Sequence, residues 1–265
     1  MEFTRDNLYS AINEDSKTLN LIDEYMYKID ELYCKLEGND KPEFKPFLFA
    51  YLSYLRLLET TEKIKNKRYL TVVDFTKPNT SKRFYVIDMQ DGPKVIHSVR
   101  VWHGHGIQKR DWSYEVWIIP TPESFSNDDW SNKSSLWSFI TSDELESNQK
   151  GTWQWLLMTW LEESNYHASS RRIFIHPGWV DRSEWCFTLP DNEVWVILDE
   201  LKWWSFVFSY YDDLDYIYDS WILNPTIANI IHDKLKIGLH AWKMKIKNAW
   251  SKVKSGLFRV LWMKK

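Results

Sequence analysis

Two side chains between Arg171 and Pro190 have the chemistry of a nucleophile and its general base. A short apolar run ends at His176, and Cys186 follows ten residues later, across a polar loop that begins with a Pro-Gly pair. An imidazole at the end of a strand and a thiol across a turn can meet in space, where the imidazole can remove the thiol proton. On spacing alone, however, a buried structural cysteine and an unrelated loop histidine are the more common arrangement.

The histidines also permit a second chemistry, which is metal binding. His103, His105 and His176, together with Asp181 or Cys186, are ligand types from which zinc sites with one open position are built. Their spacing matches none of the compact zinc motifs, in which ligands recur within a few residues. A zinc-dependent hydrolase therefore remains an alternative to a cysteine enzyme.

Tryptophan and glycine have unusual frequencies. The chain of 265 residues contains 17 Trp and only 8 Gly, whereas average usage predicts about 19 Gly at this length. Every Trp lies at or after Trp102, and Trp203-Trp204 follows a helical run where a glycine cap is expected. Because some genetic codes read UGA as glycine and others as tryptophan, we hypothesise that many of these residues are glycine in the native protein. The alternative is a protein rich in true tryptophan that stacks on sugar rings.

The residues before position 67 predict helices. Apolar residues recur at spacings of three or four from Leu19 to Leu32 and again from Phe47 to Leu58, with a break at Gly38–Pro42. The second stripe predicts a helix over 44–64 that packs on the domain that follows. Cys34 has apolar neighbours in the first helix, which predicts a buried and unreactive thiol.

From Tyr69 onward the hydrophobic period changes to that of strands. Three runs rich in β-branched and aromatic residues, separated by turn residues, predict a β-meander that ends at Trp102-His103-Gly104-His105-Gly106. The glycines at its end allow the backbone to approach a ligand closely. The predicted elements are strands at 69–75, 83–89, 95–102, 136–141, 153–161, 173–176 and 205–210, and a helix at 192–201.

Charge is unevenly distributed along the chain. From His232 to Lys265 there are ten Lys or Arg and one acidic residue, although the net charge of the whole chain is −3. This tail predicts a basic helical segment that either lies on an anionic membrane or polymer, or remains in solvent. It lacks a recognisable nucleic-acid motif and the rest of the chain is acidic, so we expect no nucleic-acid partner. We also expect no disulfide framework, no export signal and no membrane-spanning stretch.

The sequence resembles a known family of enzymes. Residues Tyr69 to Asp88 are similar to the opening strands of the murein L,D-transpeptidase catalytic domain of the YkuD-like type. The similarity continues through His103-Gly104, Pro122–Ser126 and Ser134–Leu136 to the cysteine loop. It implies that this chain has the fold of that domain.

The fold that the resemblance implies is α+β, with a mainly antiparallel β-sandwich or barrel-like catalytic domain over residues 67–211. A helical segment over residues 1–66 is expected to pack on this domain, and a basic helical tail over residues 212–265 to follow it. The similarity itself extends from Phe44 to Tyr211.

The family's motifs assign roles to residues of this chain. The family has a base histidine after a short strand and a nucleophile in a Ser-x-Gly-Cys motif, which correspond to His176 and Cys186. Trp185 stands where the family has glycine, and the backbone N–H groups of Trp185 and Cys186 are the expected oxyanion donors. The other residues expected at the site are Ser183 for loop support, and His103, His105 and Arg182 for substrate binding.

The activity that the resemblance implies is acyl transfer on peptidoglycan stem peptides. The thiolate of Cys186 would attack the carbonyl of the third, diaminopimelate-type residue. The terminal D-alanine would then depart, and a thioester to Cys186 would form. An amine of a neighbouring stem would then form a cross-link, whereas water would make the enzyme a carboxypeptidase. No metal or other cofactor is expected, and the substrate implies a location in the cell envelope. A zinc-dependent wall hydrolase and a non-catalytic wall-binding module remain the alternatives.

Overall fold

The computed structural model describes most of the region between residues 27 and 223. The described residues are 27–104, 121–122, 124–129, 131–147, 153–178, 183–212, 220 and 222–223. The predicted helical residues 1–26 and the basic residues 224–265 lie outside them. None of the described helices has the length and apolar character needed to span a membrane.

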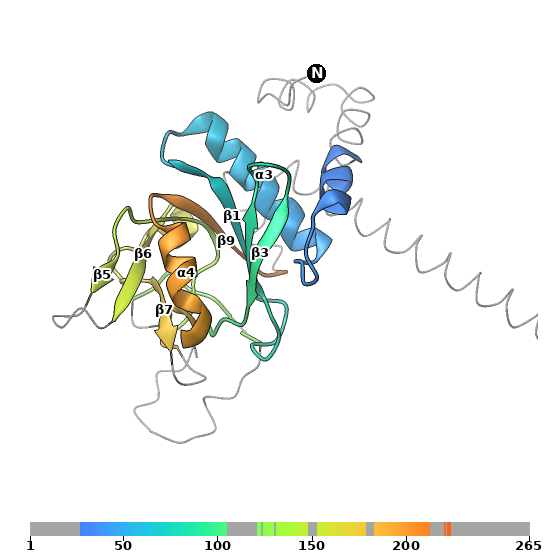
Figure 1. The fold of residues 1–265 in the computed structure, drawn as a ribbon. Coiled ribbons are helices and arrows are strands. Elements are labelled where there is room, and N and C mark those ends of the chain that lie inside the picture. Colours follow the sequence, from blue (N-terminus) through green and yellow to red (C-terminus); the bar gives the residue numbers. More distant parts are fainter. Residues whose placement is uncertain are drawn as a thin grey trace, which may run out of the picture. The chain divides into compact units, whose positions relative to one another are not determined.

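A strand-rich sheet forms the body of the described region (Figure 1). Its strands are β1 (Asn66–Asp74), β2 (Phe84–Asp88), β3 (Lys94–Val99), β4 (Trp137–Thr141), β5 (Glu146–Ser147), β6 (Gln154–Trp160), β7 (Phe174–Gly178), β8 (Phe187–Pro190) and β9 (Ser205–Tyr210). They follow the order β3-β2-β1-β9-β4-β6-β7-β8, and β5 pairs with β6 beside this path. Neighbouring strands are antiparallel except for β1 with β9 and β7 with β8, which are parallel.

The sheet curls until its two ends approach each other. After β3 the chain continues to Trp102, whose backbone N–H donates to the Thr188 carbonyl oxygen in β8 at 2.9 Å. Two residues later, Gly104 forms a bridge with Ser183. These contacts join β8 and the loop before it, at one end of the strand order, to the segment that follows β3, at the other end. The fold is therefore α+β, with a mainly antiparallel, nearly closed and barrel-like sheet.

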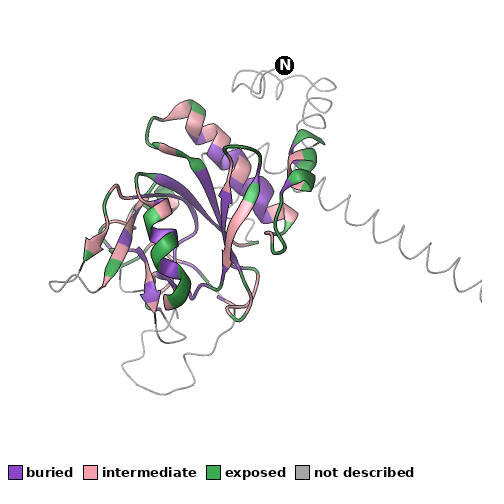
Figure 2. Ribbon diagram, viewed as in Figure 1, coloured by how far each residue is buried: buried purple, intermediate pink, exposed green. Residues whose placement is uncertain are grey.

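Two helices cover parts of the sheet (Figure 1). The apolar stripe of α3 (Phe44–Thr60), which includes Phe47 and Leu57, is buried as the helix packs on β1 and β9. The helix α4 (Asp191–Leu201) buries Val194 and Ile197 and packs on β7 and β8. Figure 2 shows buried residues in the central strands, mainly intermediate and exposed residues in β3 and β5, and exposed residues along the outer side of α4. Residues 27–35 are also helical, and a short 3₁₀ helix, η2 (Glu163–Asn165), precedes β7.

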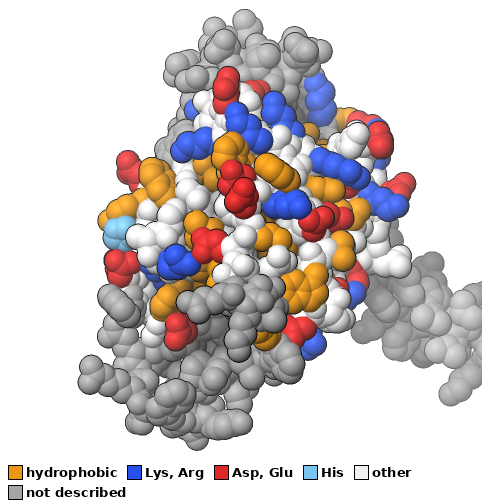
Figure 3. All heavy atoms as spheres, turned by 60° about the vertical axis from the view of Figure 1, so that its left-hand side comes forward, with side chains coloured by type: hydrophobic (Ala, Val, Ile, Leu, Met, Phe, Trp, Pro, Cys, Tyr) orange, Lys and Arg blue, Asp and Glu red, His pale blue; other side chains and the backbone are white. Residues whose placement is uncertain are grey.

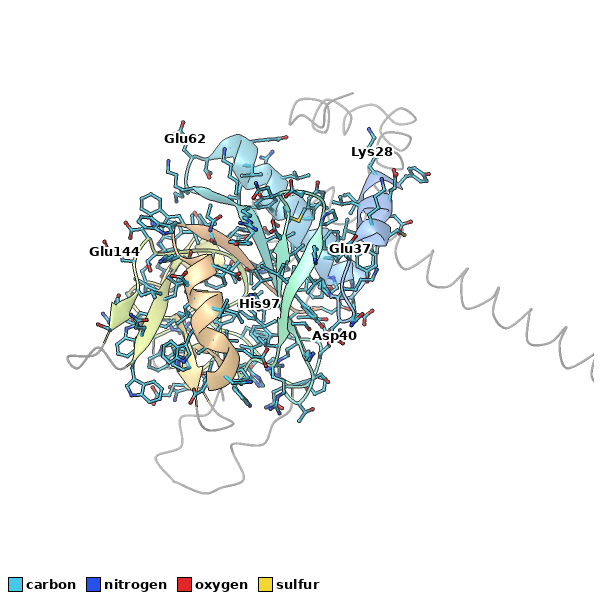
Figure 4. All side chains as sticks on the ribbon, viewed as in Figure 1. Lys28, Glu37, Asp40, Glu62, His97 and Glu144 are labelled. Atoms are coloured by element: carbon cyan, nitrogen blue, oxygen red, sulfur yellow. The ribbon has the colours of Figure 1, made fainter. Side chains whose placement is uncertain are left out.

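The described surface is mixed in charge. Figure 3 shows basic, acidic and apolar side chains interspersed over one face. His97 on β3 lies beside α4 (Figure 4), where its Nε2 is 2.6 Å from the Glu200 carboxylate. This contact ties an early strand to the helix that covers β7 and β8.

The prediction that Cys34 is buried is wrong, because this residue is exposed. The buried residues nearest to it are Ile29 and Leu36. Ile29 lies in the helix over residues 27–35, and a position five residues after it points away from the face that Ile29 buries.

Three tryptophans adopt a backbone conformation that bulky side chains disfavour. Trp137, Trp203 and Trp204 have φ angles of 78°, 74° and 60°, in the left-handed region that glycine adopts without strain. Trp203 and Trp204 form the turn between α4 and β9, where a glycine cap is expected from the sequence. Trp137 begins β4 and is buried. These angles support the hypothesis that glycine is the native residue at these positions.

Candidate active site

The register of β7 and β8 sets His176 beside the segment that contains Cys186. The parallel pairing aligns Ile175 with Phe187 and His176 with Thr188. Because side chains alternate across a strand, the buried Ile175 and Phe187 point to one side, and His176 and Thr188 point to the other. Cys186 immediately precedes β8, two residues before Thr188.

His176 is held as a neutral imidazole by hydrogen bonds at both ring nitrogens. Its Nδ1 lies 2.7 Å from the Pro177 carbonyl oxygen, which can only accept, so Nδ1 carries the proton. Its Nε2 then accepts from the Thr188 hydroxyl at 3.2 Å. Burial lowers the pKa of His176 below its usual value, and the bond to Pro177 opposes this shift. A neutral imidazole is the form that acts as a general base, once Nε2 is released from the Thr188 hydroxyl.

Cys186 is present as a thiol rather than a thiolate. Its sulfur accepts from the Phe174 N–H at 3.4 Å and donates to the Arg172 carbonyl oxygen at 3.6 Å. Burial raises the pKa of Cys186 to about 12, and the Phe174 N–H opposes this shift. No hydrogen bond joins Cys186 to His176 among the described residues. The sulfur must therefore turn away from Arg172 before the imidazole can take its proton.

Two serines hold the peptide groups on either side of Cys186. The Ser134 hydroxyl donates to the Trp185 carbonyl oxygen at 3.2 Å, and the Ser183 hydroxyl donates to the Cys186 carbonyl oxygen at 2.7 Å. In a trans peptide the C=O and N–H groups point in opposite directions. By fixing the Trp185 carbonyl, Ser134 therefore also fixes the direction of the Cys186 N–H, which is one of the expected oxyanion donors.

Gly104 packs directly against the cysteine loop. Its N–H donates to the Ser134 hydroxyl oxygen at 2.9 Å. A Cβ atom at this position would lie 2.5 Å from the Glu184 carbonyl oxygen and 2.6 Å from that of Asn132, which is too close for any side chain. The sequence predicts that this glycine permits close approach of a ligand, and in the structure the group that approaches is the backbone of the loop itself.

His103, which precedes Gly104 in the chain, lies next to the buried Arg83. Arg83 Nη2 donates to His103 Nδ1 at 2.7 Å, and Arg83 also donates twice to the Val101 carbonyl oxygen, at 3.0 and 2.7 Å. Burial and the guanidinium charge lower the pKa of His103 to about 3, while burial lowers the pKa of Arg83 to about 9. At neutral pH the imidazole is therefore neutral and the guanidinium charged.

The aromatic ring of Phe75 lies against both His103 and Arg83, which places this pair within the core. A contact between His103 and substrate stays a prediction. The predicted contacts His105 and Arg182 lie outside the described residues, as does the possible zinc ligand Asp181. Within the described part of the chain, no group of three or more His, Cys, Asp and Glu is arranged to hold a metal ion.

Sequence reasoning missed the groups that frame the site. Ser134 is 51 residues from its partner Trp185, and Arg83 is 20 residues from His103. Thr188 lies in β8, a strand of four residues that the sequence does not distinguish from the loop before it. The only signal for Ser134 is its place in a stretch that resembles the family, and Arg83 has the weaker signal of a charged residue at the start of an apolar strand.

The fold and the site together define a class of protein: a strand-rich α+β domain with an imidazole on one strand and a thiol directly before the neighbouring strand. A comparison with protein families finds the L,D-transpeptidase catalytic domain, YkuD_2, over residues 41–210, which is more than half of the chain. The chain therefore belongs to the L,D-transpeptidase catalytic domain family. No curated protein matches it.

Proposed function

We propose that this protein is a cysteine-dependent L,D-transpeptidase that acts on peptidoglycan stem peptides through a thioester on Cys186. The observation that carries this proposal is the parallel pairing of β7 and β8, which sets Thr188, two residues after Cys186, against His176 Nε2. Membership of the family supports the class of reaction and the wall substrate. The acceptor, an amine or water, determines whether a cross-link or a shortened stem results.

The first half-reaction begins at the sulfur of Cys186. The thiol turns from the Arg172 carbonyl toward His176, whose Nε2 takes the proton as the sulfur attacks the carbonyl carbon of the third stem residue. The Pro177 carbonyl oxygen holds Nδ1–H and stabilises the imidazolium that forms. As the tetrahedral intermediate collapses, the imidazolium gives its proton to the amine of the leaving D-alanine, and the thioester remains.

In the second half-reaction an amine of a neighbouring stem attacks the thioester carbonyl. His176, neutral again, removes a proton from the attacking amine, and the sulfur leaves and regains a proton. Attack by water through the same steps releases a free carboxylate. Both routes use the same two side chains, so access of the acceptor selects between them.

The negative charge on the tetrahedral intermediate needs donors that are already in position. The backbone N–H groups of Trp185 and Cys186 are the proposed donors, and the bond from Ser134 to the Trp185 carbonyl supports this role because it orients the second of them. Losing one oxyanion donor costs on the order of 3 kcal/mol of transition-state stabilisation in other enzymes.

We further propose that Trp185 is glycine in the native protein, as are the tryptophans with positive φ. Trp185 occupies the family's glycine position, and three other tryptophans have backbone angles that glycine adopts without strain. The gene should have UGA codons at positions 137, 185, 203 and 204, and the protein from its native source should have the mass expected for glycine. UGG codons at these positions would overturn this proposal.

The proposal assigns the chemistry to the domain over residues 67–211, supported by the helical residues before it. Its site of action is the cell envelope, where the substrate lies.

The main test is turnover of a tetrapeptide stem, followed by mass spectrometry of the peptide and of the protein. We expect release of D-alanine and a thioester on Cys186, and acylation of the same residue by a carbapenem. The chain offers a matched control, since Cys34→Ala removes the other thiol and should leave both results unchanged, whereas Cys186→Ala should abolish them. Both Trp185 and Trp185→Gly proteins are measured, because the glycine form is expected to be the more active.

The alternatives give different results in the same assay. A zinc hydrolase would lose activity to a chelator and keep it after alkylation of the thiols. A wall-binding module would retain glycan without releasing D-alanine. Either result, or full turnover by Cys186→Ala, would contradict the proposed mechanism.

A further inference from the structure

The Ser134 hydroxyl joins two segments of the chain that meet beside the nucleophile. It accepts from the Gly104 N–H at 2.9 Å and donates to the Trp185 carbonyl oxygen at 3.2 Å. Because an amide N–H can only donate and a carbonyl can only accept, the hydroxyl proton must point toward Trp185. The residue is 1% exposed. The hydroxyl is therefore held in one orientation by partners on both sides.

The peptide group that receives this bond is the one that carries the Cys186 N–H. Its C=O and N–H point in opposite directions, so the N–H points away from Ser134. Among the described residues, none accepts the Cys186 N–H. Successive hydrogen bonds in a protein interior polarise one another, by roughly 10–30% per bond. The bonds from Gly104 through Ser134 to this peptide therefore strengthen the Cys186 N–H as a donor as well as orienting it.

Close packing keeps the three segments in register. A Cβ atom at Gly104 would lie 2.7 Å from the Ser134 nitrogen and 2.5 Å from the Glu184 carbonyl oxygen. The backbones of all three segments are thus in direct contact at Gly104. This contact leaves the Ser134 hydroxyl little freedom to move away from the cysteine loop.

Arg171 holds the segment that carries Ser134. Its guanidinium is a rigid, planar group with donors in fixed directions, and the residue is 5% exposed. All four of its acceptors lie between residues 126 and 135: Ser126 O at 2.8 Å, Ser131 Oγ at 3.3 Å, Lys133 O at 2.6 Å and Ser135 Oγ at 2.8 Å. Since Lys133 directly precedes Ser134, the guanidinium fixes the backbone from which the hydroxyl extends.

We propose that Ser134 is a positioning residue of the oxyanion site, and that it acts through the peptide group between residues 185 and 186. This inference rests on the proposed function, in which the Cys186 N–H binds the oxyanion. The oxygen becomes negatively charged only when the sulfur attacks, so the hydroxyl stabilises the transition state more than the bound stem. Its acceptor is a backbone carbonyl, which is present with either tryptophan or glycine at position 185.

The test separates effects on the transition state from effects on binding of the stem. It measures kcat and KM for stem turnover, and the inhibition constant of a tripeptide whose third residue ends in an aldehyde. The Cys186 sulfur adds to the aldehyde carbon and the thiol proton passes to the oxygen, which gives a hemithioacetal with its oxygen in the oxyanion site. Ser134→Ala and Ser134→Val remove the hydroxyl, and Ser134→Thr keeps it. Each is made with Trp185 and with Trp185→Gly.

Thr141→Val is the matched control. The Thr141 hydroxyl is also buried, accepts from the Ser205 N–H at 2.8 Å and donates to the Leu201 carbonyl oxygen at 2.6 Å. It therefore has the same kind of partners as the Ser134 hydroxyl, but its partners lie at the turn between α4 and β9. Thermal unfolding of every variant shows what the loss of each hydroxyl costs in stability.

We expect Ser134→Ala and Ser134→Val to lower kcat about 10- to 50-fold, a part of the roughly 10²- to 10³-fold loss that follows removal of an oxyanion donor itself. The inhibition constant of the aldehyde should rise by a similar factor, while KM stays within about threefold. Ser134→Thr should recover most of the activity. Thr141→Val should lower the midpoint of unfolding and leave kcat within about twofold. The same pattern is expected with Trp185→Gly.

Equal activity of Ser134→Thr and Ser134→Val would overturn the inference, as would a change in KM alone or an equal loss of kcat in Thr141→Val. A crystal structure of the parent protein with the aldehyde needs no variant. It should show the bond from Ser134 intact and the Cys186 nitrogen within hydrogen-bond distance of the hemithioacetal oxygen, and a peptide turned away from that oxygen would overturn the inference. If the parent turns over stems, such results count against Ser134 alone. A parent that forms neither thioester nor aldehyde adduct would instead contradict the proposed function.

Discussion

The molecule holds two imidazoles through Nδ1, His103 against Arg83 and His176 against the Pro177 carbonyl. The partner of His103 is a positively charged donor, so Nδ1 must accept and the proton lies on Nε2. The partner of His176 is an acceptor, so Nδ1 keeps the proton and Nε2 keeps its lone pair. Residue type is the same at both positions, and the hydrogen-bond partner alone reverses the tautomer.

The two partners also set how readily each ring takes a second proton. Burial and, to a lesser extent, the guanidinium lower the pKa of His103 to about 3, which keeps the imidazole neutral throughout the physiological range. Burial also lowers the pKa of His176, but the Pro177 carbonyl opposes that shift and would stabilise the imidazolium. His103 is therefore suited to hold a buried segment in place, and His176 to move a proton.

The same substitution at both positions gives the largest expected contrast. His176→Asn removes the proposed base and should lower kcat/KM for stem turnover by about 10³-fold or more. His103→Asn should keep kcat/KM within about tenfold while lowering the midpoint of thermal unfolding, because it disturbs the contacts of Arg83. Stem turnover and calorimetric unfolding of both variants provide the measurement. A large loss of activity in a folded His103→Asn protein would contradict the assignment of a purely structural role to His103.

A second contrast lies in the pH dependence of stability. The ordinary pKa of histidine is 6.5 and that of folded His103 is about 3, so the unfolded chain takes up this proton first as the pH falls. The contribution of neutral His103 is therefore complete above pH 6.5 and is lost as the pH falls toward 3. At pH 4 the loss is on the order of 3 kcal/mol.

Urea unfolding at pH 7 and pH 4 measures this loss in the parent protein and in His103→Asn. Carboxyl groups titrate over the same range in both proteins, so the difference between the two pH dependences isolates the imidazole. We expect the variant to lose less stability between the two pH values. Equal losses would mean that the pKa of His103 is not lowered in the folded protein.

Much of the fold can be predicted because periodicity is a local property. The stripe from Phe47 to Leu58 predicts α3, and runs of β-branched and aromatic residues predict seven of the strands to within a few residues. The parallel pairing of β1 with β9 joins residues more than 130 positions apart, such as Leu70 with Phe206, and no local pattern contains it. The strand β8 escapes prediction because four residues show too little alternation.

The sequence predicts only those parts of the site that consist of chemically distinctive side chains. A histidine at a strand end and a cysteine after a polar loop nominate His176 and Cys186 from the sequence. The groups that prepare them are backbone atoms or distant residues, such as the Pro177 carbonyl and the Ser134 hydroxyl. The positions of these groups depend on strand register and on the close packing of segments such as Gly104 against the cysteine loop. Neither register nor packing can be read from residue types alone.

The smallest expected effect on activity comes from removing the Thr188 hydroxyl, which donates to the lone pair on His176 Nε2. Thr188 donates to Nε2 at 3.2 Å, a bond that stabilises the neutral ring and competes with the approaching thiol. Thr188→Val has nearly the same shape without the donor, so it should raise the pKa of His176 and move the acid limb of the kcat/KM profile to higher pH. At neutral pH the change in rate should be about two- to fivefold, as for the loss of one neutral hydrogen bond.

The pH profile of stem turnover and the urea unfolding of the same variant test this expectation together. His103 has no such hydroxyl, so Thr188→Val should leave the loss of stability between pH 7 and pH 4 unchanged. An acid limb that stays in place would mean that Thr188 does not set the basicity of His176. A changed pH dependence of unfolding would mean that the two imidazoles are coupled through β8, since the Thr188 carbonyl oxygen accepts the Trp102 N–H next to His103.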